Sequence, residues 1–265
     1  MNLAPAARLA MLGPAVHKRL VFPLLCAVAT AVALLVASSR AEARQAEALG
    51  EPEHLEIPGQ PDAFFYRARV RGAAPIIMFL HGRGGNPAED CRKWARVATQ
   101  FGWLVCPQGP EDRGGGSRAW NNNPAAGQAV IDAAADALRA KYKRRVRTRG
   151  NILVGFSEGA FIAMQVGLHE PRRWNRWLIL AANDQYWWGD APGLLDENRR
   201  RIRRVFLLTG ENDEVASNTQ RVAALLKDKK IPTRVRIQSG MGHEVPADRM
   251  ITTYRRPLRW LIAAN

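Results

Sequence analysis

A serine lies at the centre of the sequence Gly-Phe-Ser-Glu-Gly, residues 155–159. The apolar run 151–156 leads into it, and a segment typical of a helix follows from Gly159. Gly-x-Ser-x-Gly between a strand and a helix is typical of a sharp turn that presents a serine hydroxyl at the edge of a sheet. Side chains at the two glycine positions would crowd this turn. The pattern predicts that Ser157 is a nucleophile, the alternative being an incidental glycine-rich turn.

A serine hydroxyl needs a base that accepts its proton, and the base needs an acid that orients it. His243 lies in the glycine-rich segment 239–246, between the last strand-like run and the last helix-like run. The other late histidine, His169, ends the helix-like segment that follows the serine. We therefore predict His243 as the base, with a solvent-exposed loop histidine as the alternative.

The candidate acid follows another apolar run, residues 205–209. Asp213 lies just beyond this run, within a Gly-x-x-Asp-x-Val sequence. Its predicted role is to accept the far imidazole N–H and to stabilise the imidazolium that forms during reaction. Glu211 and Glu214 are competing carboxylates on the same loop.

The elements that must position these residues alternate along the chain. Apolar runs typical of buried strands are separated by segments with helical periodicity. Strands alternating with helices of this length predict one α/β domain with three layers, in which helices cover both faces of a mostly parallel sheet. The expected strands are residues 64–70, 76–80, 103–106, 151–156, 177–181, 205–209 and 233–237, and the expected helices are 87–101, 125–142, 159–169, 215–230 and 246–263.

The order nucleophile, acid, histidine in this setting resembles the α/β-hydrolase superfamily. The resemblance covers roughly residues 64–264, and within the superfamily the chain looks most like small esterases of the carboxylesterase, dienelactone hydrolase, feruloyl-esterase or polyester-depolymerase groups. It implies a three-layer α/β-hydrolase fold and a triad of Ser157, Asp213 and His243. It also implies cleavage of carboxylic esters through an acyl-enzyme.

The sequence His-Gly-Arg-Gly-Gly, residues 81–85, looks like the superfamily's oxyanion loop. The resemblance assigns the donors to the backbone N–H groups of Arg83 and Glu158, and it gives His81 a structural role in the loop. Arg83 departs from the small or apolar residue often found at its position. Its side chain is expected either to bind an anionic group of the substrate or to pair with a loop acid, for which Glu158 is a candidate.

Four aromatic residues in the two long segments 108–124 and 183–201 are candidates for substrate binding, with packing over the sheet edge as the alternative. Long loops in compact domains are often functional. The short chain leaves room only for a small cap, which favours small-molecule esters or exposed polymer ends. The four residues are Trp120, Tyr186, Trp187 and Trp188.

Other functions remain open at this point. Thioesters, amides and lactones use the same machinery, and an acyltransferase would replace water with an alcohol. A peptidase would need a site for a peptide amine, for which we find no motif. A non-catalytic binding protein of this fold is a further alternative. No metal-ligand spacing or phosphate-cradling loop is present, so the sequence predicts neither a metal nor another cofactor.

The first 43 residues have the order of an export signal. Basic residues ending in Lys18 and Arg19 precede the uncharged apolar run 20–37, and Ala41 and Ala43 fit a small-residue cleavage site. We expect residues 1–43 to be an export signal or, alternatively, a membrane anchor formed by residues 20–37. The catalytic domain then comprises residues 44–265, and the protein is expected to be periplasmic or secreted.

Two cysteines remain once Cys26 of the apolar run is set aside. An even pair in an exported chain is compatible with a disulfide. In the fold implied by the resemblance, Cys91 lies early in a helix and Cys106 ends the neighbouring strand, and helix starts and strand ends share the same edge of the sheet. The alternative is two buried free thiols.

The chain is strongly basic, with a formal net charge of +15. Arginine and lysine cluster at residues 141–149 and 199–204. Such charge favours an anionic surface, including a membrane, as a partner; the alternative is solvated charge without a partner. Aromatic residues are not interleaved with these clusters, so nucleic acid is not an expected partner. The sequence does not indicate an oligomeric state.

Overall fold

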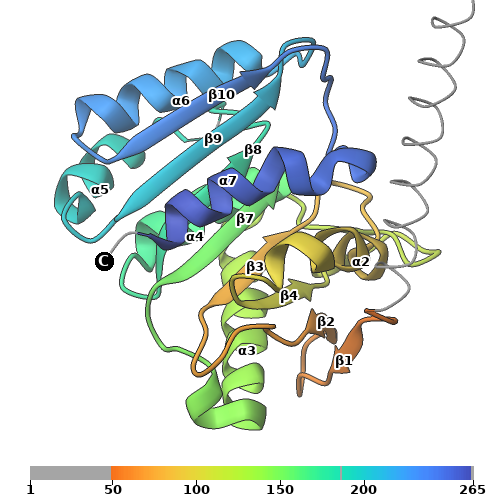
Figure 1. The fold of residues 1–265 in the computed structure, drawn as a ribbon. Coiled ribbons are helices and arrows are strands. Elements are labelled where there is room, and N and C mark those ends of the chain that lie inside the picture. The colour runs from red at the N-terminus through yellow and green to blue at the C-terminus, as the bar shows by residue number, and fades with distance from the viewer. Residues whose placement is uncertain (1–48, 186, 264–265) are drawn as a thin grey trace, which may run out of the picture. The chain divides into compact units, whose positions relative to one another are not determined.

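An eight-stranded sheet forms the centre of the fold, in the strand order β1-β2-β4-β3-β7-β8-β9-β10 (Figure 1). Strand β2 runs antiparallel to both of its neighbours, and all strand pairs from β4 to β10 are parallel. The bounds are Glu53–Leu55 (β1), Ala63–Tyr66 (β2), Ile76–Leu80 (β3), Trp103–Pro107 (β4), Asn151–Phe156 (β7), Trp174–Leu180 (β8), Arg204–Gly210 (β9) and Thr233–Gln238 (β10).

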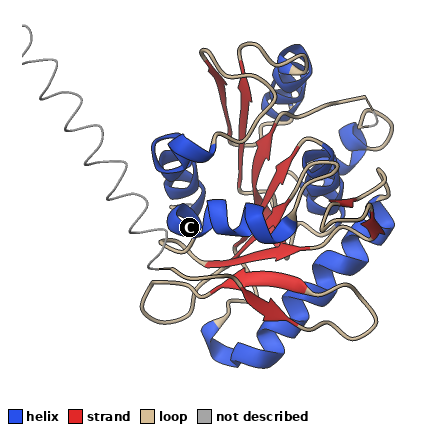
Figure 2. Cartoon of the chain, turned by 90° about the vertical axis from the view of Figure 1, so that its right-hand side faces the viewer, coloured by secondary structure: helices blue, strands red, loops and turns tan. Residues whose placement is uncertain are grey.

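Helices cover both faces of this sheet (Figures 1 and 2). Helices α2 and α7 share one hydrophobic core with the sheet, and helices α3 to α6 share the other. All five residues of β3 are buried, as expected of a parallel strand covered on both faces. The bounds are Pro87–Ala98 (α2), Pro124–Tyr142 (α3), Glu158–His169 (α4), Ala191–Asn198 (α5), Ala216–Asp228 (α6) and Met250–Ile262 (α7).

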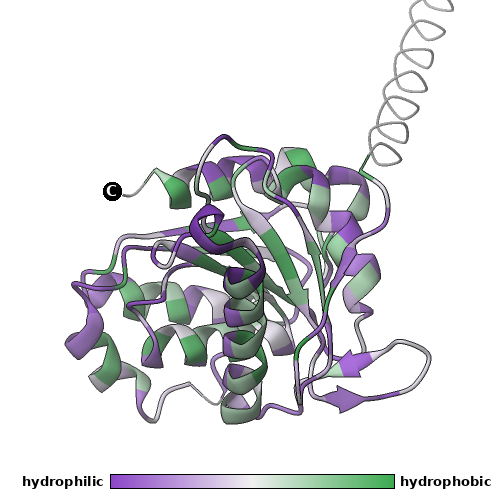
Figure 3. Ribbon diagram, turned by 90° about the horizontal axis from the view of Figure 1, so that it is seen from below, coloured by the Kyte–Doolittle hydropathy of each residue, from purple (hydrophilic) through white to green (hydrophobic). Residues whose placement is uncertain are grey.

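The computed structural model describes residues 49–185 and 187–263. The predicted export segment, residues 1–43, lies outside the described residues and stays a prediction, as does the division of the chain at residue 43. No helix within the described ranges is both long and apolar enough to cross a membrane. Figure 3 shows apolar residues concentrated in the central strands and polar residues on the outward surfaces of the helices.

Helix α5 and strands β1, β5 (Glu111–Asp112) and β6 (Arg118–Ala119) are not among the elements expected from the sequence. Helix α5 lies inside the segment 183–201, and the hairpin of β5 and β6 lies inside the segment 108–124. Pro192 in the first turn of α5 is the helix-start signal that could have revealed it. The expected strand 64–70 is shorter, because β2 ends at Tyr66 where its pairing with β4 ends.

Cys91 in α2 and Cys106 in β4 form a disulfide, with their Cα atoms 5.7 Å apart. Both residues are at most 1% exposed. The structure therefore contains the predicted disulfide and not two free thiols. The bond ties the helix that follows the predicted oxyanion loop to the strand beside it.

Candidate active site

Ser157 occupies the turn between β7 and α4 with φ 54° and ψ −118°. This backbone conformation is rare for a residue with a Cβ and marks local strain. Two hydrogen bonds hold the turn: the Ser157 N–H donates to the Leu180 carbonyl at 3.1 Å, and the Ala160 N–H donates to the Ser157 carbonyl at 2.9 Å. The turn follows the carboxyl end of β7, the edge at which ligands bind in open α/β sheets.

The predicted crowding at the flanking glycines is confirmed. A Cβ on Gly155 would lie 2.3 Å from the carbonyl oxygen of Gly159. A Cβ on Gly159 would lie 2.3 Å from the carbonyl oxygen of Leu80. Both contacts are with backbone atoms, which cannot rotate away as a flexible side chain can. The close approach of β7, α4 and β3 therefore requires glycine at both positions.

We expect Gly159→Ala to lower the free energy of unfolding by about 1–3 kcal/mol, because the added methyl group overpacks a contact between backbones. Urea denaturation of the variant and the wild type measures this difference. The matched control is Gly189→Ala, because a Cβ at Gly189 would meet no atom within 4 Å. Equal unfolding free energies for the two variants would contradict the prediction.

Three side chains from three loops form a continuous hydrogen-bonded series. His243 Nε2 lies 2.9 Å from Ser157 Oγ, and His243 Nδ1 lies 3.0 Å from Asp213 Oδ1. An ionised carboxylate only accepts hydrogen bonds, so Nδ1 carries the proton and the Nε2 lone pair faces the serine hydroxyl. This tautomer is the one that a general base requires.

Asp213 is almost fully buried at the end of β9, with 5% of its surface exposed. Burial by itself raises the pKa of the carboxyl group, but hydrogen bonds from the Thr209 hydroxyl, the Val215 N–H and His243 outweigh burial and hold the pKa below its usual value. The Thr209 and Val215 donors lie 2.6 and 3.0 Å from the carboxylate oxygens. The group is therefore a carboxylate at neutral pH.

The competing carboxylates do not take this place. Glu211 accepts a hydrogen bond from the Ser239 hydroxyl at 2.8 Å, and Glu214 is exposed at the rim of the pocket beside Ser157. The structure thus brings Asp213, and neither glutamate, to His243.

The buried side chain of His81, which is 1% exposed, holds the predicted oxyanion loop in place. The Gly109 N–H donates to His81 Nε2 at 3.1 Å, so the ring proton is on Nδ1, which donates to the Gly82 carbonyl at 2.8 Å. Burial is the main reason why the pKa of His81 lies below its usual value. The indole N–H of Trp120 donates to the His81 carbonyl at 2.9 Å. These contacts agree with a structural role for His81.

The two predicted oxyanion donors belong to segments that adjoin Ser157. Glu158 is the first residue of α4, where backbone N–H groups lack partners within the helix. Arg83 follows Gly82, which lies so close to Ser157 that a Cβ added to the glycine would be 3.4 Å from the Cβ of Ser157. Within the described residues, the N–H groups of Arg83 and Glu158 donate to no backbone acceptor outside regular helix and strand pairing. Both N–H groups are therefore free to donate to an external acceptor.

The side chain of Glu158 links three segments around the site, although it is only 7% exposed. One carboxylate oxygen accepts the Trp120 N–H at 2.9 Å, and the other accepts the Asn122 N–H at 3.2 Å and the Arg83 guanidinium at 2.7 Å. The predicted pairing of Arg83 with a loop acid is thus present. Asn121 and Asn122 both have left-handed φ angles, 52° and 47°.

A cavity of about 310 Å³ opens beside Ser157. Its walls combine polar and charged surface with a comparable amount of apolar surface. The lining residues are Arg83, Asn122, Ser157, Glu158, Phe161, Ala181, Asn183, Gln185, Glu214, Val215 and His243.

The aromatic residues expected to bind substrate do not line this cavity in the described part of the chain. Trp120 and Trp187 are completely buried in the core, where their large rings pack against other apolar groups. Trp188 is 42% exposed, and its indole N–H donates to Asp184 at 2.9 Å. Tyr186 lies outside the described residues. For Trp120 and Trp187, the structure thus favours the alternative of packing, whereas the exposed Trp188 neither lines the cavity nor packs in the core.

Sequence reasoning missed the polar wall of the cavity. Asn183 and Gln185 flank Asp184, which is 2% exposed and pairs with Arg221 at 2.7 and 2.9 Å. This pairing anchors the loop after β8. Its position beyond the carboxyl end of a parallel strand was the available signal.

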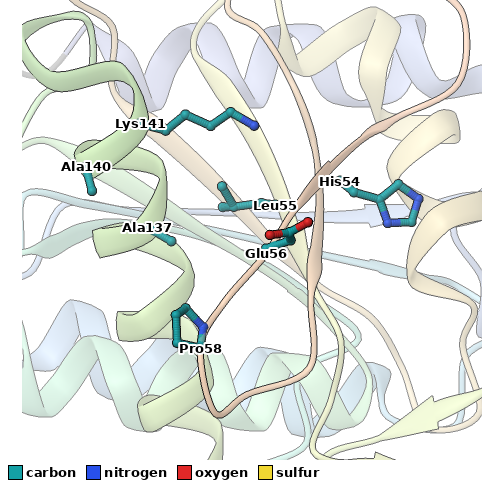
Figure 4. Close-up of a pocket in the computed structure, with 7 residues that line it drawn as sticks. All are labelled: His54, Leu55, Glu56, Pro58, Ala137, Ala140 and Lys141. Carbon is teal, nitrogen blue, oxygen red and sulfur yellow. The ribbon is translucent and has the colours of Figure 1, made fainter.

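A second cavity, of about 450 Å³, lies between the β1–β2 turn and α3 (Figure 4). It is larger than the cavity at Ser157, but none of the triad residues lines it, and we assign it no chemistry. The lining residues are His54, Leu55, Glu56, Pro58, Ala137, Ala140 and Lys141. No group of three or more metal-ligating side chains occurs among the described residues.

No protein-family model and no curated protein matches the sequence. Solved structures do match. An uncharacterised protein from Bacillus cereus superimposes with a TM-score of 0.61 at 20% identity over 72% of this chain and 60% of its own, so the chain spans less than two thirds of that protein. The Bacillus cereus carboxylesterase has a TM-score of 0.55 at 15% identity, over 75% of this chain and 92% of the enzyme. Esterase PE8 has a TM-score of 0.53 at 23% identity, over 74% and 97%.

The chain has the α/β-hydrolase fold. The mostly parallel sheet covered on both faces and the esterase-type neighbours confirm the fold predicted from the sequence. At these identities the α/β-hydrolase likeness concerns the architecture, and the chemistry of the site must be argued from its own residues.

Proposed function

We propose that the protein is a serine hydrolase that cleaves carboxylic esters. The observation that carries the proposal is the hydrogen-bonded series from Asp213 through His243 to Ser157 on a strained turn of an α/β-hydrolase fold. The esterase names of the neighbours support an ester as the substrate.

In the proposed mechanism, Ser157 Oγ attacks the ester carbonyl carbon while its proton passes to His243 Nε2. The carbonyl oxygen becomes an oxyanion, which accepts hydrogen bonds from the N–H groups of Arg83 and Glu158. His243 then returns the proton to the leaving alkoxide as the C–O bond breaks, which leaves an acyl-enzyme. Water repeats the sequence, with His243 as its base, and releases the acid.

The cavity supports a substrate of modest size with polar groups. A volume of about 310 Å³ lies at the lower end of the range for ligand pockets. Asn122, Asn183 and Gln185 offer hydrogen bonds, and Phe161 and Val215 provide the apolar wall.

An acyltransferase or a thioesterase would use the same triad, and product analysis in the presence of an added alcohol distinguishes acyl transfer from hydrolysis.

The test is hydrolysis of p-nitrophenyl acetate, butyrate and octanoate by the purified protein. We expect turnover of acetate and butyrate and a lower kcat/KM for octanoate, because a cavity of about 310 Å³ has too little room to bury a long alkyl chain. A lack of turnover on all three esters, with the protein folded, would contradict the proposal. A preference for octanoate would refute the size argument alone.

Glu158→Gln should lower kcat by about 10²-fold with a smaller change in KM. Glutamine retains the size but can no longer accept from all three donors, so Arg83 and the segment 120–122 lose their common partner, and removing one oxyanion donor has a comparable cost. Steady-state kinetics measures the effect. Glu170→Gln, at the other end of α4, is the matched control. A fall in thermal stability with unchanged kcat would show a purely structural role for Glu158.

A further inference from the structure

The edge of the sheet opposite the candidate site carries a concentration of positive charge. The segments that enter the parallel strands at their amino ends contain fourteen exposed lysine and arginine residues, which we call the basic edge. Its members are Arg67, Arg69, Arg71, Lys143, Arg144, Arg145, Arg147, Arg149, Arg172, Arg199, Arg200, Arg201, Arg203 and Lys230.

Few acids neutralise the basic edge. The segments that contribute it, residues 67–75, 143–150, 170–173, 199–203 and 229–232, contain one acidic residue, Glu170. Within the described part of the chain, Arg67 alone of the fourteen forms an ion pair, with Glu53 at 2.7 Å. In that same part, the other thirteen cations have no carboxylate partner, and among them Arg147 and Arg201 donate to neutral oxygens of Ala73 and Asn198.

The carboxyl edge of the same sheet has the opposite sign. The loops 81–86, 108–123, 181–190, 211–215 and 239–249 hold nine aspartate and glutamate residues and four arginines. The domain is thus polarised along its strands, with the candidate site at the acidic end. A polarised charge distribution orients a protein in an external field more effectively than the same net charge spread evenly.

Further arginines lie beside the basic edge, at the starts of strands β8, β9 and β10. Arg176, near the start of β8, has a pKa below its usual value, first because of burial and then because of the neighbouring cations of Arg147, Arg203 and Arg204. Arg204 also stacks on the ring of Trp260, with the guanidinium carbon 4.9 Å from the ring centroid, and Arg234 does so at 4.8 Å. Part of this charge is therefore held rigidly by packing.

We propose that the basic edge docks the protein onto an anionic lipid bilayer, with the candidate site facing away from the lipid. A bilayer presents a broad, flat layer of negative charge, which matches cations spread over five separate segments. The sequence also contains the uncharged run 20–37 near its start, which is expected to bring the chain to a membrane during export or to anchor it there.

Single-stranded nucleic acid matches the basic edge less well. Single strands bind to proteins largely by stacking their bases on aromatic side chains. Among the described residues, the exposed large hydrophobic side chains are Trp188 and Val235, and neither belongs to the basic edge. Trp103, which lies close to it, is 1% exposed beneath Arg145. Bases would find no platform there.

The experiment is flotation of the full-length protein with vesicles of phosphatidylcholine, with and without phosphatidylglycerol, at low and high salt. The edge variant combines Arg144→Gln, Arg149→Gln and Arg200→Gln. These three residues are exposed, and within the described part of the chain their guanidinium groups form no hydrogen bond or ion pair. We expect tighter binding to vesicles that contain phosphatidylglycerol, and a loss on the order of 10²-fold in the edge variant. High salt should abolish the difference between the two vesicle types.

The matched control removes the same charge elsewhere through Arg113→Gln, Arg255→Gln and Arg256→Gln, all exposed and outside the basic edge. Binding that the control retains and the edge variant loses supports the proposal. Equal losses in both variants, or binding that does not depend on phosphatidylglycerol, would overturn it. Binding of a single-stranded oligonucleotide that the edge variant loses, without any lipid effect, would assign the edge to nucleic acid instead. Hydrolysis of soluble esters should be the same in both variants, so this test is independent of the proposed function.

Discussion

Ser157→Ala should abolish ester hydrolysis, with a fall in kcat of about 10⁴- to 10⁶-fold. The hydroxyl oxygen 2.9 Å from His243 Nε2 is the atom that would form the acyl bond, and a methyl group cannot replace it. The residual rate would come from binding and from the oxyanion donors acting on water. Initial rates with p-nitrophenyl acetate, measured alongside unfolding curves for both proteins, test this expectation.

The control for this experiment is Ser239→Ala. Ser239 lies on the same loop as His243, is exposed, and donates to Glu211 at 2.8 Å, outside the triad. A fluorophosphonate probe, which phosphonylates activated serines, should label the wild type and Ser239→Ala and leave Ser157→Ala unlabelled. Labelling of Ser157→Ala at another serine, with turnover preserved, would refute the assignment of the nucleophile.

The sequence could reveal the architecture because the signals that specify it are local. Fully apolar runs such as Ile76–Leu80 occur in strands covered on both faces, and the glycines around Ser157 are required by backbone contacts a few residues away in the chain or on a neighbouring strand. The positions of Asp213 and His243 were predictable for a related reason. Each lies a few residues beyond the end of a strand, β9 or β10, and the carboxyl ends of parallel strands meet at one edge of the sheet.

The walls of the cavity could not be predicted in the same way, because they depend on contacts between distant loops. Trp120 and Trp187 occur in long polar segments, yet both rings turn inward and are completely buried. Whether a loop tryptophan turns toward the core or toward a cavity is decided by the space that other elements leave. The contacts of Glu158 with Trp120 and Asn122 likewise join residues 38 and 36 positions apart, and no periodicity encodes such a pairing.

Asp213→Asn should lower kcat by about 10⁴-fold while leaving the fold intact. Asparagine can still occupy the space between Thr209 and Val215, but it carries no negative charge to stabilise the imidazolium. Its amide N–H can also donate to Nδ1 of His243, which favours the tautomer with the ring proton on Nε2. The matched control is Glu211→Gln, because Glu211 is the neighbouring acid on the same loop and bonds to Ser239 instead. A comparable loss of kcat in both variants would contradict the assignment of Asp213 as the orienting acid.

The same pair of variants tests the electrostatics of the site through stability. The pKa of Asp213 is lower in the folded protein than in the unfolded chain, so its carboxylate stabilises the fold above the unfolded pKa of about 3.9. This stabilisation is lost as the pH falls through the lower, folded pKa. Between neutral and acidic pH, the free energy of unfolding should therefore fall less in Asp213→Asn than in Glu211→Gln. Identical pH dependence in the two variants would mean that the hydrogen bonds from Thr209, Val215 and His243 do not favour the ionised carboxylate. The proposed stabilisation of the His243 imidazolium by Asp213 would then lose its basis.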